Sequence, residues 1–169
     1  MNGYESTLSL IMNMELFSAN TPTTSVRADP VHFMVGMRDV VMQPLDSASQ
    51  MDEAEREMAR AAVNELLGPQ GGEFCWLTDA AGWITLPEAE PISTAPPSVY
   101  WNSEIGDELR QSCHKNWSRL FTELQMLMFD LEFNRVREQE GRITVSGFWL
   151  WGGFQHAKHY EVECFANTS

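Results

Sequence analysis

Two β-hairpin patterns alternate with two helical patterns along this chain, and this order limits the fold more than any other feature. Residues 31–35 and 40–43 are short runs rich in β-prone side chains, separated by a Gly-containing turn. Residues 73–78 and 83–86 repeat this arrangement around a second Gly-containing turn. Both pairs of runs therefore predict antiparallel hairpins.

The first helical pattern follows the first hairpin. Ser49 is a good N-cap candidate, and Asp52 and Glu53 put negative charge where the helix dipole favours it. Gly68 and Pro69 are expected to end the helix, since glycine suits a C-cap and proline cannot continue the hydrogen bonding. Spacing near 3.6 residues predicts the buried face: Met51, Ala54, Met58, Ala61, Ala62 and Leu66.

The second helical pattern is the longest element and is expected over residues 106–137. A β-rich strand over residues 143–151 follows it and ends at Gly152 and Gly153. The long helix carries one apolar stripe: Leu109, Cys113, Trp117, Leu120, Leu124, Leu127, Met128 and Leu131.

Hairpin, helix, hairpin, helix and strand together predict an α+β fold. Its sheet is mainly antiparallel, made of two hairpins plus a C-terminal strand, and two helices cover it. A length of 169 residues suits one domain, which we place at residues 28–153. Residues 18–30 are rich in Ser, Thr, Asn and Pro, so residues 1–27 are expected to be an irregular lead-in. Residues 154–169 form a C-terminal tail.

Charge narrows the choice of partner. Eleven basic against 24 acidic side chains give a formal charge of −13, which repels phosphate backbones and anionic lipid headgroups. Neither nucleic acid nor a membrane is therefore expected as a partner. The first 17 residues lack a positive segment before an apolar one, and no apolar run is long enough to span a bilayer. Cysteines are few and widely spaced, which favours reduced thiols and a cytoplasmic location: Cys75, Cys113 and Cys164.

Motifs for catalysis or metal binding are missing. The chain has no GxSxG, no GxxxxGK[ST] and no GxGxxG, so we expect no catalytic residues, no metal and no cofactor. His156 and His159 are three residues apart, but they follow the last expected element, where a solvated tail is the simpler interpretation. A run of acids is interpreted as a solvated helix face: Asp46, Asp52, Glu53, Glu55 and Glu57.

The end of the long helix carries the candidate ligand-binding residues. Asn134 and Arg137 are three residues apart and so share a helix face, and Gln125 lies among apolar neighbours. Arginine presents a rigid fork of donors that suits a carboxylate or phosphate, and asparagine both donates and accepts. These residues could hold an anion, or they could serve helix capping and a structural ion pair.

The stretch SGFWLWGGF, residues 146–154, adds further candidates. Alternation puts Trp149 and Trp151 on one face of the strand and two apolar side chains on the other, which predicts a central strand. Gly152 and Gly153 mark places where another backbone or a ligand can approach closely. The indole rings could stack on a ligand or pack in the core.

Several of these motifs occur together, in the same order and spacing, in one bacterial family. The chain resembles the RpfE-type regulatory proteins through these segments: Ala28-Asp29-Pro30-Val31-His32, Glu123-x-Gln125-Met126, Asn134-x-x-Arg137, Gly141 and Trp149-Leu150-Trp151-Gly152-Gly153. The resemblance covers roughly residues 25–153 and is strongest over residues 120–153. The tail pattern is also similar to the inserted domain of archaeal-type, cofactor-independent phosphoglycerate mutases. The metal ligands of those mutases have no counterpart here, so mutase chemistry is not expected.

The chain departs from the family pattern at several polar positions. Phe129 and Leu131 stand where family members usually have histidines, and Glu132-Phe133 replaces a Pro-Val. Ser146 replaces an Asn, and Phe154 replaces the third glycine of a usual GGG.

Three functional hypotheses follow from the sequence. The first is a non-catalytic regulatory domain that binds a protein partner or another copy of itself, since six Trp, nine Phe and ten Met suit adaptable contact surfaces. The second is a domain that binds a phosphorylated small molecule through Gln125, Asn134, Arg137 and the Gly152-Gly153 turn, or acts on it. The third is an acidic mimic that occupies a basic groove on a nucleic-acid-binding protein.

Overall fold

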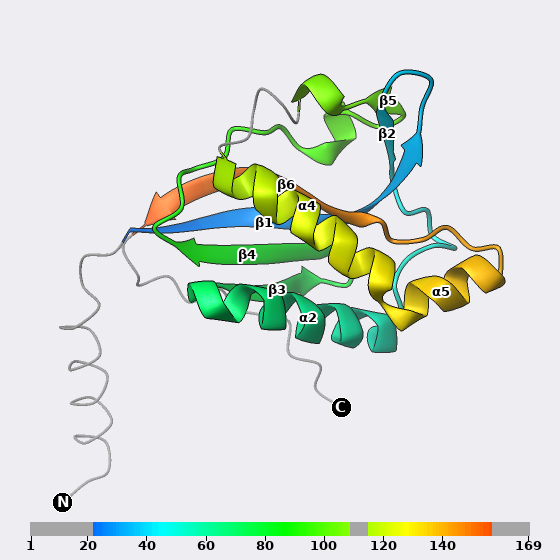
Figure 1. Cartoon of the computed structure of the whole chain (residues 1–169), viewed down its shortest axis with the longest axis horizontal. Coiled ribbons are helices and arrows are strands. Elements are labelled where there is room, and N and C mark those ends of the chain that lie inside the picture. Colours follow the sequence, from blue (N-terminus) through cyan, green and yellow to red (C-terminus); the bar gives the residue numbers. More distant parts are fainter. Residues whose placement is uncertain (1–21, 109–114, 157–169) are drawn as a thin grey trace, which may run out of the picture.

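The computed structural model describes residues 22–108 and 115–156 (Figure 1). Within these residues the predicted α+β fold with an antiparallel sheet is confirmed. The sheet runs in the order β3-β4-β1-β2-β5, and β6 pairs with β1 off this path. The elements are β1 Thr23–Val35, β2 Val40–Gln43, α2 Glu53–Leu67, β3 Glu73–Thr78, β4 Ala81–Pro87, β5 Ser103–Glu104, α4 Lys115–Asp130, α5 Glu132–Gln139 and β6 Gly147–His156.

Strand β1 is the centre of the sheet. Its first part pairs with β4 and β6, and its last four residues, His32 to Val35, pair with β2. The loop expected over residues 18–30 is therefore wrong from Thr23 onward. Composition suggested a loop because of its hydroxyl side chains and Pro30, but Pro30 lies beyond the last residue that pairs with β4, Ala28. The missing N–H of that proline therefore removes no hydrogen bond to β4.

Strand β6 runs from Gly147 to His156 rather than from Ile143 to Trp151, so the tail expected from residue 154 is wrong at residues 154–156. The prediction that β6 is a central strand is also wrong. Among the described residues it pairs only with β1. Phe148, Trp149 and Leu150 are nevertheless buried, because α4 packs on this strand and the segment after β4 lies along it, with the Gly152 N–H donating to the Thr94 carbonyl. An edge strand covered in this way looks like a central one in sequence.

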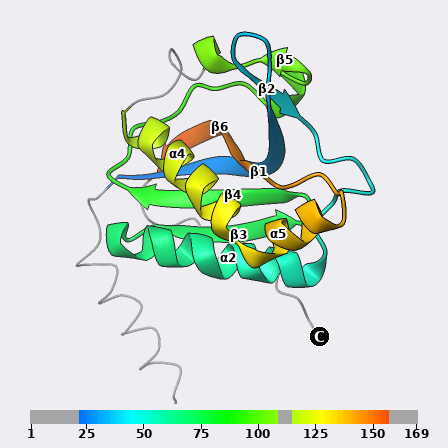
Figure 2. The same ribbon diagram turned by 45° about the vertical axis from the view of Figure 1, so that its right-hand side comes forward.

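Helices α2 and α4 lie on the same side of the sheet, α2 against β3 and α4 across β6 and β1 (Figures 1 and 2). The two-helix cover expected from sequence is therefore present. The indole N–H of Trp76 on β3 donates to the Arg56 carbonyl on α2, which fixes α2 to the edge of the sheet.

Helix α2 differs from its prediction in where it begins and in which face it buries. The N-cap is Asp52, not Ser49, and Asp52 and Glu55 form a capping box in which each side chain accepts from the backbone N–H of the other. The buried face is Glu55, Ala59, Val63 and Leu67, whereas Met58 is 44% exposed. The prediction failed because it treated Glu55 as part of a solvated acidic run.

The long second helix is broken. Leu131 has an extended conformation, with φ −69° and ψ 135°, and it separates α4 from α5. Residues 109–114, and with them Leu109 and Cys113 of the predicted stripe, lie outside the described residues. The described part of the stripe is largely confirmed, since Trp117, Leu120, Leu124 and Met128 are buried.

Cys75 is disulfide-bonded, so the expectation of reduced cysteines is wrong at this position. Cys113 and Cys164 lie outside the described residues. None of the described helices has the length and apolar character that crossing a membrane requires.

Candidate functional site

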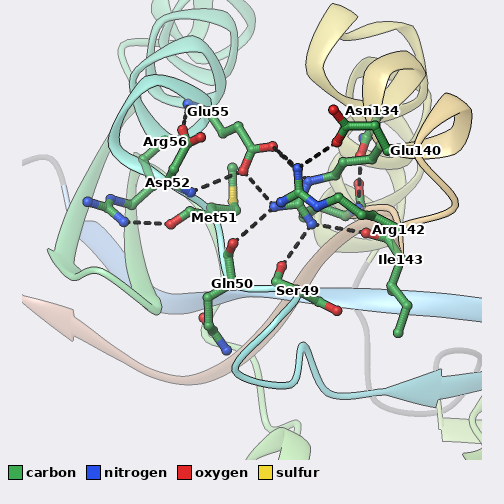
Figure 3. Close-up of polar contacts among 12 residues, drawn as sticks. Ser49, Gln50, Met51, Asp52, Glu55, Arg56, Asn134, Glu140, Arg142 and Ile143 are labelled. Atoms are coloured by element: carbon green, nitrogen blue, oxygen red, sulfur yellow. Dashed lines mark hydrogen bonds and ion pairs between the residues drawn. The ribbon is translucent and has the colours of Figure 1, made fainter.

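The predicted ligand-binding residue Arg137 lies inside the protein and is fully buried. Its Nε and Nη2 donate to the two carboxylate oxygens of Glu55, at 2.9 and 2.6 Å. Its remaining N–H groups donate to the backbone carbonyls of Ser49, Gln50 and Ile143, at 2.8 to 3.2 Å (Figure 3). All five donors of the guanidinium are thus used by the protein, which corresponds to the structural ion-pair interpretation and leaves no donor for an anion.

The Glu55 carboxylate joins these contacts to the start of α2. Besides Arg137, it accepts the Asp52 backbone N–H at 3.0 Å, and the Arg142 guanidinium lies 3.7 Å away. We call Arg137, Glu55 and the three carbonyls at 49, 50 and 143 the Arg137 clamp. The clamp ties α5 to α2 and to the segments that precede α2 and β6.

Asn134 is also buried and also serves the backbone. Its Nδ2 donates to the carbonyls of Met128 and Val145 at 2.7 and 2.9 Å, and its Oδ1 accepts the Val145 N–H at 2.9 Å. The side chain thus joins the last turn of α4 to the segment leading into β6. It holds the break between α4 and α5 in place, because a helix end leaves backbone carbonyls that need donors.

The two tryptophans of β6 occupy different surroundings. Trp149 is buried, donates its indole N–H to the Ala95 carbonyl at 2.9 Å and packs against the rings of Phe121 and Tyr100. The pKa of Tyr100, whose ring packs against Trp149, is raised by burial, and a hydrogen bond with Glu108 raises it further. Trp149 thus belongs to the core.

Trp151 is half-buried against β1. Its indole N–H donates to Asp29 at 2.8 Å, and the Arg27 guanidinium lies over its ring, 5.0 Å from the centroid. Arg27 and Asp29 also pair with each other at 2.9 Å. This face of Trp151 is therefore occupied by groups of the protein.

The two glycines serve strand pairing. Gly152 has φ +49°, and the register between β6 and β1 shifts by one residue beside it, as a β-bulge requires. A side chain at Gly153 would come within 2.9 Å of the Val26 side chain.

A cleft of about 290 Å³ lies where α4, α5 and the segment before β6 meet. Of the seven residues that we predicted to bind a ligand, Gln125 and Asn134 contribute to its lining, and the other five do not. Its lining residues are Gln125, Phe129, Asn134, Arg135, Glu138, Thr144 and Ser146.

The cleft is lined by an exposed aromatic ring and by charged side chains of both signs. Phe129 is 75% exposed, and Met126, one turn earlier on α4, is 66% exposed. Arg135 makes one contact of 3.5 Å with Glu132, whereas no cation of the described residues lies within 4.0 Å of the Glu138 carboxylate. The cleft is thus lined by an exposed aromatic ring and by a carboxylate without an ion-pair partner in the part of the chain that the structure describes, and both are available for contact with another molecule.

Ser146, which lines the cleft, lies next to His32, an arrangement that resembles a catalytic nucleophile with its general base. The Ser146 Oγ is 3.2 Å from His32 Nδ1, but Nδ1 is also 2.9 Å from the Thr144 carbonyl. A carbonyl only accepts, so Nδ1 must carry the hydrogen and cannot take a proton from Ser146. Ser146 in turn accepts the Phe33 backbone N–H at 3.0 Å. The pair fixes β1 to the segment before β6.

The described residues contain no group of three or more His, Cys, Asp or Glu side chains that could hold a metal ion. Comparisons of the chain with protein-family models, with curated proteins and with solved structures find no match. The site must therefore be interpreted from its own geometry.

Sequence reasoning missed five residues as cleft residues: Phe129, Arg135, Glu138, Thr144 and Ser146. One signal was present: Met126 and Phe129 are large apolar residues at i, i+3 that fall outside the buried stripe of the same helix. The break at Leu131, which creates the cleft, had no comparable signal.

Proposed function

We propose that this chain is a non-catalytic regulatory domain of RpfE-like type that binds a protein, and that the α4–α5 cleft is its contact surface. The observation that carries the proposal is the exposure of Phe129, which lines the cleft and is 75% exposed although most of the apolar stripe of the same helix is buried. Exposed aromatic and methionine side chains grouped around a depression are typical of protein interaction sites.

The polar groups around the cleft support binding rather than catalysis. Asn134 and Arg137 have their hydrogen-bonding groups on protein partners, and His32 cannot act as a base toward Ser146 through Nδ1. The region with the strongest RpfE-type resemblance, residues 120–153, contains every residue that lines the cleft. The family likeness and the geometry thus point to the same part of the chain.

The other two hypotheses have less support. Binding of a phosphorylated small molecule relied on Arg137, whose five donors are all taken. An acidic mimic needs a continuous array of exposed carboxylates, yet Glu55 is buried and several others pair with arginines of the chain.

Photo-crosslinking inside the native host tests the proposal. A benzophenone amino acid placed at position 129 should give a crosslinked protein band, and the same group at position 126 should give the same band. Position 58 is the matched control, since Met58 is an exposed apolar residue on α2, outside the cleft. The partner is then identified by mass spectrometry, and Phe129→Asp should lower its measured affinity at least tenfold.

A crosslink to a second copy of the chain would identify the partner as itself. In that case the mass in solution should rise with protein concentration. A strict monomer with no crosslinks from positions 126 and 129, or with the same bands from position 58, would overturn the proposal.

A further inference from the structure

The size of the cleft limits what can enter it. A volume of about 290 Å³ is at the lower end of the range for small-molecule sites, which is roughly 300–1,000 Å³. It therefore suits one long side chain of a partner better than a large ligand.

The two charged side chains that line the cleft, Arg135 and Glu138, differ in their ion pairing. Glu138 lines the cleft without an ion-pair partner among the described residues, and Arg135 is engaged with Glu132. The Arg137 charge is neutralised internally by Glu55. Two further exposed carboxylates, Asp130 and Glu140, lie along the same stretch of α4 and α5, while Arg142 pairs with Glu140.

The exposed ring of Phe129 adds the second element of a cation site. An aromatic face attracts a guanidinium or ammonium group through its quadrupole, and a carboxylate forms charge-assisted hydrogen bonds with the same group. Phe129 comes from the last turns of α4 and Glu138 from α5, and both line the one cleft.

We propose that the cleft receives a single arginine or lysine side chain of the protein partner, with its alkyl stem on Phe129 and its charged group at Glu138. This inference rests on the proposed protein-binding function and specifies the chemistry of the partner. The charge of −13 on the whole chain steers a basic segment toward the site and makes association depend on salt.

The test uses the full chain and N-acetyl-arginine amide as the probe. Backbone amide signals of residues 125–146 are followed by NMR while the probe is raised to about 50 mM, because one side chain alone should bind in the millimolar range. We expect saturable shifts confined to the cleft. N-acetyl-citrulline amide, which has nearly the same shape without the charge, is the matched control ligand and should give much smaller shifts.

Two substitutions at exposed positions assign the contacts. Glu138→Gln and Phe129→Ala should each weaken arginine binding by about two- to fivefold or more. Glu65→Gln removes an exposed carboxylate of α2 that does not line the cleft, and it should leave binding within about twofold of the unmodified chain.

The inference is overturned if arginine gives no saturable shifts, if citrulline binds equally well, or if Glu138→Gln and Glu65→Gln behave alike. A partner crosslinked at position 129 that binds independently of salt and of Glu138 would refute the cation proposal while leaving the proposed function in place. Failure of crosslinking at both positions would instead remove the function on which the inference rests.

Discussion

Two glutamates of helix α2 pair with arginines in nearly the same geometry but in different surroundings, Glu55 with Arg137 of α5 and Glu57 with Arg60 of α2 itself. Arg137 and Glu55 approach to 2.6 Å, as do Arg60 and Glu57, and in both pairs the Nε and one Nη donate to the two carboxylate oxygens. The side chains of the first pair are 0% and 7% exposed, whereas those of the second are 44% and 59% exposed.

This difference in burial shows that hydrogen-bond length alone does not determine how much each pair contributes to stability. Glu55 and Glu57 are two residues apart, so the helix turns one carboxylate toward the protein and the other toward water. In water each partner of the exposed pair can be solvated separately. Inside the protein no water replaces a missing partner. Removing one member of a buried pair therefore leaves the other charge uncompensated and lowers the free energy of unfolding strongly.

Arg137→Ala should have the largest effect. The change leaves the buried Glu55 carboxylate and three backbone carbonyls without their hydrogen-bond donor. The free energy of unfolding should therefore fall by about 3–5 kcal/mol. Urea denaturation followed by tryptophan fluorescence measures this change. The variant should be hard to fold at elevated temperature.

Arg135→Ala is the control on the same helix, because Arg135 is exposed and makes one contact of 3.5 Å. Its stability should stay within about 0.5 kcal/mol of the unmodified chain. If both arginine variants prove equally harmless, the Arg137 clamp does not hold the fold together.

Asn134→Ala should come second. The change removes three buried hydrogen bonds and leaves the N–H and C=O of Val145 unsatisfied, so stability should fall by about 1–3 kcal/mol. Amide hydrogen exchange should speed up first around residues 128–134 and 143–147, where this side chain joins two segments. A uniform increase across the sheet would argue against a local joining role.

Arg60→Ala should cost about 0.3–0.5 kcal/mol, as is typical of an exposed helix pair. The hydrogen bond from Arg60 lowers the pKa of Glu57, against a small opposing effect of burial. A lowered pKa in the folded state means that the pair contributes above the ordinary pKa of glutamate, and that this contribution is lost as the pH falls through the lowered value. Carboxyl NMR titration should show the Glu57 pKa returning upward in Arg60→Ala, and no change there would contradict the assignment.

Phe129→Ala and Glu138→Gln should have the smallest effect on stability, within about 0.5 kcal/mol. Phe129 is largely exposed, and Glu138 has no ion pair among the described residues. The same two variants should lose partner binding, which separates a contact surface from a structural one. A loss of stability comparable to that of Asn134→Ala would show that the cleft residues belong to the fold.

The sequence predicted the second hairpin and the buried stripe of α4 because local signals agreed there. Turn residues between β-prone runs define residues 73–87, and an apolar period of 3.6 defines α4. It failed at β1, where pairing with two distant strands overrides a loop-like composition. The prediction from sequence failed again at Leu131. Helix propensity favours a continuous helix there, but α4 ends and the Asn134 side chain donates to the Met128 carbonyl in its last turn.

The candidate site was predicted only in part. Asn134 and Arg137 were correctly placed on one helix face, and Gln125 and Asn134 do line the cleft. The role of Arg137 depended on Glu55, 82 residues away, and no local spacing relates the two. The other residues of the cleft were missed because the cleft lies at the break between α4 and α5, which the sequence did not predict.

The sequence by itself determined the α+β class, the hairpins and the acidic character, since turn chemistry, periodicity and charge are local or additive properties. Only the tertiary structure decided which arginine is buried, which acid accompanies it and which aromatic ring stays exposed. Those outcomes depend on contacts between segments far apart in the chain. Arg137 thus has the structural role that the sequence left open beside anion binding, and Phe129 is exposed, because burial is a property of the packed molecule.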